Sequence, residues 1–111
     1  MSYPIPSKLN KASKHLCKSI LTHFGGSAAV ANSLTAYNIE SSRQYVHAWI
    51  KSGAVPFNQL HDVSLVLNVS QWALSYAKLL SILGDKAPSF EEVVKATPLD
   101  PGKKVQILAV K

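Results

Sequence analysis

The chain has 111 residues, of which 47% are hydrophobic and 16% are charged, a composition that excludes a disordered chain and suits one folded domain rather than two. Twelve Lys and Arg residues against six Asp and Glu residues give a net charge of +6. Cys17 is the only cysteine, which excludes an intrachain disulfide and a thiolate metal cluster within one chain.

The basic residues dominate the N-terminal half of the chain. Residues 1–60 hold six basic residues and one acid, Glu40, whereas residues 61–111 hold six basic and five acidic residues. This distribution is typical of a surface that meets nucleic-acid phosphates or an anionic membrane. The N-terminus lacks a signal-peptide core, and no apolar run approaches the roughly 18 residues that span a bilayer. We therefore expect a cytoplasmic protein with no membrane partner.

The first predicted elements are a flexible arm over residues 1–6 and a helix. Ser7 is predicted to cap this helix, which runs to about Phe24, where Gly25 and Gly26 end it. Its apolar residues recur at spacings of three and four: Leu9, Ala12, Leu16, Ile20 and Phe24. Its lysines share another face: Lys8, Lys11, Lys14 and Lys18. This face is either an ordinary solvated surface or a phosphate-binding one.

Two short helices are predicted next. Ser27 is predicted to cap a helix that ends at Leu34, followed by a connection over residues 35–41. The next helix is predicted to begin at Ser41 or Ser42, because an S-x-x-Q capping box starts at Ser41.

The C-terminal half is predicted to contain three further helices and a strand. Gly53 suits a helix end, and Pro56 suits the first turn of the next helix. Ser70 and Ser89 are predicted caps of the later helices. The elements are expected over residues 56–68, 71–83, 90–96 and, for the strand, 103–111.

A homodimer is expected from two features of this half. Residues 71–83 are apolar on nearly every side of the helix, and a single strand needs a partner strand, from a second copy or from an unrecognised segment. The low share of charged residues agrees with apolar surface that is buried against a partner. The candidate dimer residues are Trp72, Leu79, Leu83, Val105 and Ile107.

The segment SRQYVHAWIKSGAVP, which starts at Ser42, predicts a helix with two different faces. Val46, Trp49 and Ile50 fall at i, i+3 and i+4 and form one apolar stripe. The opposite face carries side chains that suit a DNA major groove: Arg43, Gln44, His47 and Lys51. Arginine can bridge the two guanine acceptors, glutamine can pair with adenine, histidine can donate to guanine, and the lysine can reach a phosphate. The alternative is an ordinary amphipathic helix with a polar outer face.

Together with HFGGSAAVANSL, this segment resembles the helix-turn-helix of phage Cro and repressor-type transcriptional regulators, over about Phe24 to Leu67. The matching positions are Ser27 at the first motif helix, Ala31 and Leu34 as its buried pair, Val46 as the central hydrophobe, and then Trp49, Gly53 and Pro56. The resemblance implies a mainly α fold, in which a five-helix Cro/repressor-like domain precedes a short C-terminal helix and β-strand.

The resemblance also assigns roles to individual residues. The base-reading positions are Arg43, Gln44 and His47, with Tyr45 and Ala48 as further contributors. The expected phosphate contacts are Ser27, Ser42 and Lys51. The sequence departs from the family between the motif helices, where Thr35 replaces the usual glycine and the connection is about five residues longer. Tyr37, Asn38 and Glu40 in this connection are further candidates for contact with DNA or a partner.

The predicted domain organisation is a flexible arm (1–6), a helix-turn-helix DNA-binding domain (7–83) and a dimerising extension (84–111). The predicted function is that of a sequence-specific DNA-binding transcriptional regulator, a phage or prophage Cro-like repressor that binds a palindromic operator as a homodimer. The alternative is a protein-interaction module, such as an antirepressor or antitoxin-like adaptor, that binds a protein through its C-terminal half.

An enzyme, a cofactor and a metal site are not expected. The four histidines never fall at the i, i+3 or i, i+4 spacing of helical metal ligands. The sequence also lacks a nucleophile elbow, a phosphate loop and a dinucleotide fingerprint. Cys17 is expected to pack without a chemical role.

Overall fold

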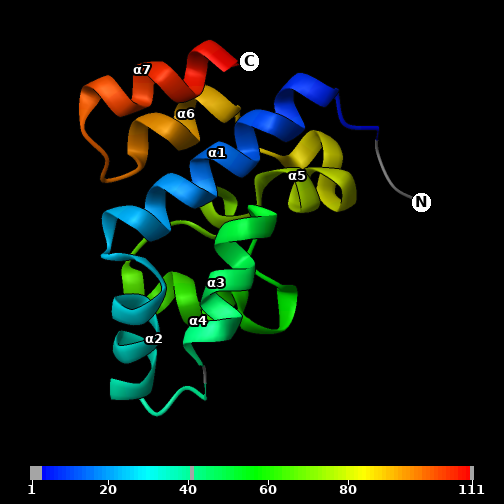
Figure 1. Cartoon of the computed structure of the whole chain (residues 1–111). Helices are drawn as coiled ribbons and strands as arrows, with labels where there is room; N and C mark the ends of the chain where they lie inside the picture. Colours follow the sequence, from blue (N-terminus) through cyan, green and yellow to red (C-terminus); the bar gives the residue numbers. More distant parts are fainter. Residues whose placement is uncertain (1–3, 41, 111) are drawn as a thin grey trace.

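The computed structural model describes residues 4–40 and 42–110, which fold into helices joined by short connections (Figure 1). The helices are α1 (Ser7–His23), α2 (Gly26–Ala36), α3 (Arg43–Ser52), α4 (Phe57–Leu67), α5 (Gln71–Leu83), the 3-10 helix η1 (Gly84–Lys86), α6 (Phe90–Ala96) and α7 (Pro101–Val110). The predicted mainly α fold is confirmed. Residues 1–3, 41 and 111 lie outside the described part, and with them half of the predicted arm, the first residue of the S-x-x-Q box and the last residue of the predicted strand.

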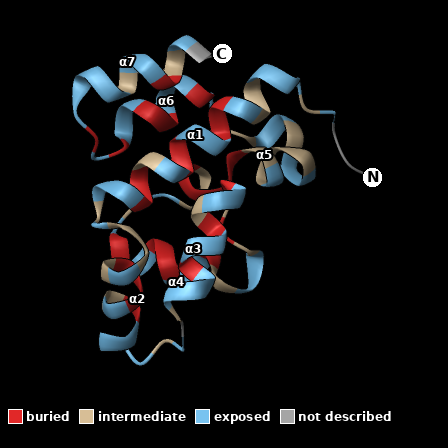
Figure 2. Ribbon diagram, viewed as in Figure 1, coloured by how far each residue is buried: buried red, intermediate tan, exposed pale blue. Residues whose placement is uncertain are grey.

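Helix α1 lies in the middle of the fold and packs against α2, α3, α5 and α7 (Figure 1). The predicted apolar face is confirmed at Ala12, Leu16 and Ile20, which have no exposed area. Cys17 and Leu21 are equally buried. Figure 2 shows buried residues following α1 along the side that faces its neighbours. The buried face is wider than the predicted stripe because helices cover α1 from several directions.

The predicted caps Ser70 and Ser89 are confirmed, and Ser42, one of the two predicted start residues, caps α3. The hydroxyl oxygens of Ser42, Ser70 and Ser89 accept hydrogen bonds from N–H groups of the first helical turn, at 3.2, 3.1 and 3.2 Å. These bonds satisfy donors that a helix start leaves without a partner, so α3, α5 and α6 begin where the sequence predicts.

Two other predicted caps are wrong. Ser7 lies inside α1 and Pro6 occupies the cap position, while Ser27 lies inside α2 and Gly25 is the cap. Gly25 and Gly26 have φ of 103° and 85°, and this left-handed backbone turns the chain so tightly that α2 starts before Ser27. Pro56 likewise caps α4 instead of lying in its first turn.

The predicted C-terminal strand is wrong, because residues 101–110 form α7. Asp100 Oδ1 accepts a hydrogen bond from the Lys103 N–H at 2.9 Å, and Pro101 occupies the first helical position, where its fixed φ is favourable. Ile107 points into the core and is 2% exposed. Ile107 is therefore unavailable as a dimer contact, and no partner strand is needed from a second copy.

The C-terminal segment packs onto the rest of the fold. Phe90, Val94 and Ile107 belong to the same buried cluster as the core residues of α1. Tyr76 links α5 to this segment, because its hydroxyl donates to the Pro88 carbonyl at 2.7 Å and its ring meets that of Phe90 edge to face.

Helix α5 is bent at Ser75, which has non-helical φ and ψ of −153° and 49°. The Ser75 hydroxyl donates to the Val55 carbonyl at 2.7 Å and accepts from the Val55 N–H at 3.2 Å. Beyond the bend, the Ala77 N–H donates to the Ser13 hydroxyl of α1 at 3.1 Å. Backbone groups around the bend thereby bond to α1 and to the connection that follows α3, which fixes α3 relative to both helices.

Candidate nucleic-acid interface

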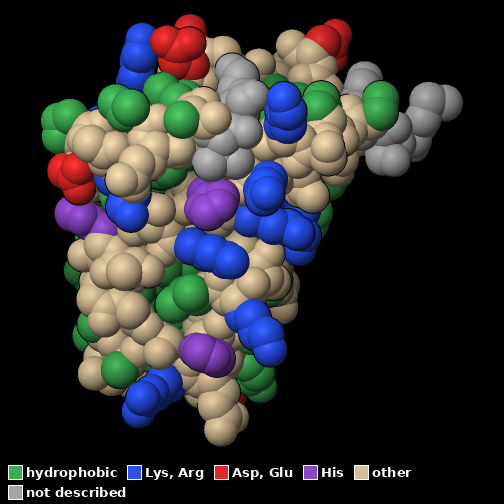
Figure 3. All heavy atoms as spheres, turned by 45° about the horizontal axis from the view of Figure 1, so that its top comes forward, with side chains coloured by type: hydrophobic (Ala, Val, Ile, Leu, Met, Phe, Trp, Pro, Cys, Tyr) green, Lys and Arg blue, Asp and Glu red, His purple; other side chains and the backbone are tan. Residues whose placement is uncertain are grey.

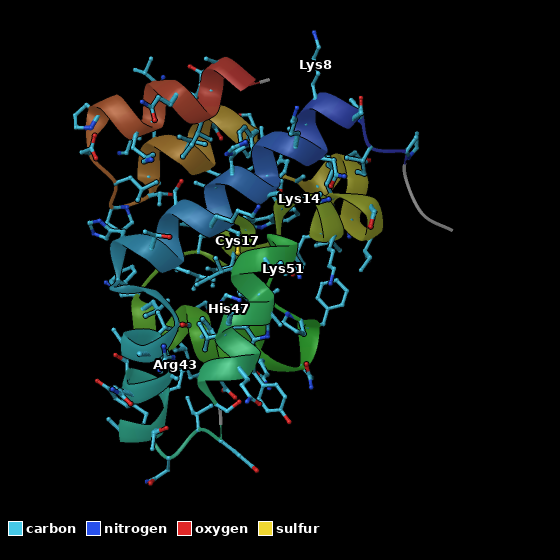
Figure 4. All side chains as sticks on the ribbon, in the orientation of Figure 1. Lys8, Lys14, Cys17, Arg43, His47 and Lys51 are labelled. Atoms are coloured by element: carbon cyan, nitrogen blue, oxygen red, sulfur yellow. The ribbon has the colours of Figure 1, made fainter. Side chains whose placement is uncertain are left out.

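Helix α3 presents the two faces that the sequence predicts. It begins after the Ser42 cap and ends at Gly53, which has a left-handed φ of 78°. Val46 and Trp49 are 0% and 4% exposed. The opposite side is exposed and carries Arg43, Gln44, His47 and Lys51. Figure 4 shows Arg43, His47 and Lys51 following one another along α3.

Helix α2 packs against α3 and closes the core behind it. Ala31 and Leu34 are buried, as predicted for the first motif helix. Leu34 accepts from the Ile39 N–H at 3.0 Å and Thr35 accepts from the Asn38 N–H at 2.9 Å, with Asn38 at a φ of 60°. This pair of bonds is a Schellman motif in which asparagine takes the left-handed position. Because α2 continues to Ala36, the connection is shorter than the predicted residues 35–41.

Helix α1 crosses the end of α3 at very short range. A Cβ atom placed on Gly53 would lie 2.5 Å from Lys14 Cβ and 2.8 Å from Lys14 Cα. Only glycine permits this approach. Figure 4 places Lys14 of α1 and Lys51 of α3 near this crossing, and both residues are exposed.

The net charge of the protein is carried by α1 and α3. Helices α1 to α3 contain six basic residues and no acidic residue: Lys8, Lys11, Lys14, Lys18, Arg43 and Lys51. The rest of the chain contains six basic and six acidic residues and is neutral overall. Within the described residues an ion pair joins Lys95 to Glu91 on α6 at 3.0 Å, and none involves α1 or α3. Figure 3 shows a band of Lys, Arg and His side chains across one face, with Asp and Glu near its margins.

The remaining predicted DNA contacts lie on α3 or at its start, except Ser27. Tyr45 is 58% exposed and Ala48 is exposed, both on α3 beside the basic residues. The Ser42 hydroxyl oxygen caps α3. Ser27 is half-buried in the first turn of α2, a helix length away from the turn that leads into α3. Its predicted phosphate contact stays a prediction.

Sequence reasoning missed two amide side chains at the edge of this face. Asn58 and Gln59 line a surface hollow together with Glu40, Tyr45, Trp49 and Pro56. Within the described part of the chain, the Oε1 atom of Gln59 is buried without a hydrogen-bond partner. Two adjacent amides in the first turn of the helix, two and three residues after its capping proline, are the signal that could have identified them.

The predicted dimer residues separate into three environments. Trp72, Leu79 and Leu83 line one surface hollow on α5, together with Ser70 and Gln71. Val105 is 67% exposed on α7, which lies on the other side of α1 from α5 (Figure 1). Ile107 is in the core. The structure thus brings three of the five residues together.

Other chemical groups are placed as follows. No group of three or more His, Cys, Asp or Glu side chains in residues 4–40 and 42–110 is arranged to hold a metal ion. Burial raises the pKa of the Cys17 thiol to about 12, so this group is uncharged at neutral pH and packs as an apolar side chain. None of the described helices combines the length and apolar composition that crossing a bilayer requires.

No family model, curated protein or solved structure matches this chain. The geometry and charge of α1 to α3 therefore carry the functional interpretation.

Proposed function

We propose that this protein is a sequence-specific DNA-binding transcriptional regulator, a Cro-like phage or prophage repressor that acts as a homodimer on a palindromic operator in the host cytoplasm. The observation that carries the proposal is the orientation of α3. Buried Val46 and Trp49 hold this helix on the core, and Arg43, Gln44 and His47 extend from its opposite side into solvent.

In this proposal α3 enters the major groove. A helix with its side chains is about 10–12 Å across, and the major groove of B-DNA is about 12 Å wide. Arg43 would bridge O6 and N7 of a guanine, Gln44 would pair with an adenine, and His47 would donate to a neighbouring acceptor. Two copies related by a two-fold axis would place their α3 helices in successive major grooves, roughly 34 Å apart, and exclude the polymerase from the site.

The test first selects operator sequences from randomised DNA. Two single-residue variants of the protein are then measured on the selected operator. Arg43→Ala should weaken operator binding by about 1–3 kcal/mol and relax the preference at one base position, because it removes a bidentate base contact. Lys51→Ala should weaken all sequences alike and reduce the salt slope of binding by about 1. Lys95→Ala on α6 is the control, since it removes the same charge elsewhere.

Two outcomes would contradict base reading by α3. One is a selection that enriches no sequence. The other is an equal loss on operator and random DNA after Arg43→Ala.

A protein-interaction module is the second candidate, and the large hydrophobic side chains in the hollow on α5 favour it. Trp72, Leu79 and Leu83 there offer an anchor site for another protein. Binding to random duplex DNA no tighter than about 10⁻⁴ M at physiological salt would favour this function over DNA recognition.

A further inference from the structure

We infer that the DNA-binding surface extends from α3 onto α1, whose Lys11, Lys14 and Lys18 bind the phosphate backbone of the duplex. The inference rests on the proposed function, because α3 in the major groove determines where the backbone lies. The inference adds a second helix to the interface, and this helix contacts the DNA backbone whatever the base sequence is.

The first support is the crossing of α1 over the end of α3. The stem of Lys14 lies against Gly53, the residue that directly follows α3. A helix that fills the major groove has a sugar–phosphate strand on either side of it. An element packed against one end of that helix therefore lies close to one of these strands. Lys11 and Lys18 lie on the same exposed face of α1 as Lys14.

The second support is that the positions of the lysines destabilise helix α1. Helix α1 has no side-chain cap at Pro6 and no acidic residue in its first turn, where the helix dipole favours negative charge. Lys8, Lys11, Lys14 and Lys18 follow at spacings of three, three and four, so like charges are neighbours on the helix surface. Protein sequences depart from such local stability rules at functional sites. A bound polyanion would reduce both the repulsion between neighbouring lysines and the unfavourable interaction of positive charge with the helix dipole.

The exposed composition of α1 favours duplex DNA over other polyanions. Its exposed residues are Ser7, Lys8, Lys11, Lys14, His15, Lys18, Thr22 and His23. This face has none of the aromatic or aliphatic side chains with which amphipathic helices anchor in a membrane. Double-stranded RNA is disfavoured because its deep, narrow major groove does not admit α3.

The test compares two triple variants that lose the same charge. Lys11→Gln, Lys14→Gln and Lys18→Gln are combined in one protein, and Lys86→Gln, Lys95→Gln and Lys104→Gln in the other. Binding to the selected operator and to a random duplex is measured over a range of salt concentrations. The α1 variant should lose about 3 from the salt slope on both duplexes and bind on the order of a hundredfold more weakly near 0.1 M salt. The control variant should lose less than about 1 from the slope.

Folding is monitored in the same variants by thermal unfolding. The α1 variant should unfold at the wild-type temperature or above it, because repulsion between neighbouring lysines is removed. If it unfolds at a lower temperature, the single variants Lys11→Gln and Lys18→Gln replace it, and each should lose about 1 from the slope.

Three results would overturn the inference. An unchanged salt slope in the α1 variant, with Arg43→Ala still relaxing base preference, removes α1 from the interface and leaves the proposed function standing. Loss of binding to phosphatidylserine vesicles without a change in the DNA slope assigns the lysines to a membrane surface. A wild-type protein that binds no duplex DNA removes both proposals.

Discussion

At the residue scale, Gly53 links the end of α3 to α1. Its φ of +78° and the 2.5 Å approach that a Cβ would make to Lys14 are separate constraints. The G-x-x-P spacing predicted the first, because a helix end followed by a proline favours a left-handed glycine. Lys14 is distant along the chain, and no local pattern pairs it with Gly53, so the second constraint could not be predicted.

Gly53→Ala should therefore lower the free energy of unfolding by about 2–4 kcal/mol, of which about 1 comes from the positive φ and the rest from the clash with Lys14. Urea denaturation measures the loss. Gly26→Ala is the matched control, since its φ is +85° but no atom lies within 4 Å of the added Cβ. Equal losses in the two variants would mean that α1 does not press on the end of α3.

At the element scale, signals carried within a few residues predicted most of the helices. Ser42, Ser70 and Ser89 cap the helices that the sequence assigns to them. The error at α7 arose because the β-branched residues of KKVQILAV favour a strand, whereas the Asp100–Pro101 pair favours a helix start. Packing of Ile107 against the core decides between the two. A sequence pattern as short as one strand carries no information about that tertiary contact.

The bend in α5 is a feature that the sequence did not predict. QWALSYAKLLSIL reads as one uninterrupted helix, yet Ser75 leaves helical geometry. The hydrogen bonds of Ser75 to Val55 and of Ala77 to Ser13 join residues that are remote in sequence. Only the assembled fold supplies these partners, so periodicity within α5 has no information about them.

Ser75→Ala should lower the free energy of unfolding by about 1–3 kcal/mol, because it leaves polar groups of Val55 buried with fewer hydrogen bonds. Chemical denaturation followed by circular dichroism measures the change. Ser81→Ala, on the same helix, removes an exposed hydroxyl that donates to the Lys78 carbonyl, and it should change stability by less than about 0.5 kcal/mol. A Ser75→Ala variant as stable as wild type would show that the bend does not depend on these bonds.

At the scale of the whole molecule, the sequence already assigned the net charge to two helices, and the structure shows that α1 crosses the end of α3. The opposite faces of α3 followed from its period, because Val46 and Trp49 fall on one side of any α-helix. The position of the α1 lysines relative to Lys51 could not be predicted from the sequence, since it depends on the crossing of α1 and α3 at Gly53. The candidate base-reading residues can therefore be identified from the sequence alone, whereas the extent of the basic surface around them cannot.

The dimer surface is the remaining question at this scale, and α5 offers one continuous candidate. Residues 73–76 of α5 are buried, but Ile82 and Leu83 are 53% and 39% exposed, beside the hollow lined by Trp72 and Leu79. Burial of such side chains between two copies would stabilise a dimer by about 1.5–3 kcal/mol for each fully buried leucine.

Leu83→Lys should raise the dimer dissociation constant by at least about tenfold, because a lysine ammonium cannot be buried there without a partner charge. Sedimentation velocity measures the shift from dimer to monomer, and operator binding should weaken in parallel because the two α3 helices are no longer held together. Leu65→Lys is the matched control, since Leu65 is 66% exposed on α4 and should leave the dimer unchanged. A wild-type protein that sediments as a monomer at every concentration, and still binds a palindromic operator with full affinity, would contradict the dimer and leave the α5 hollow to a different protein.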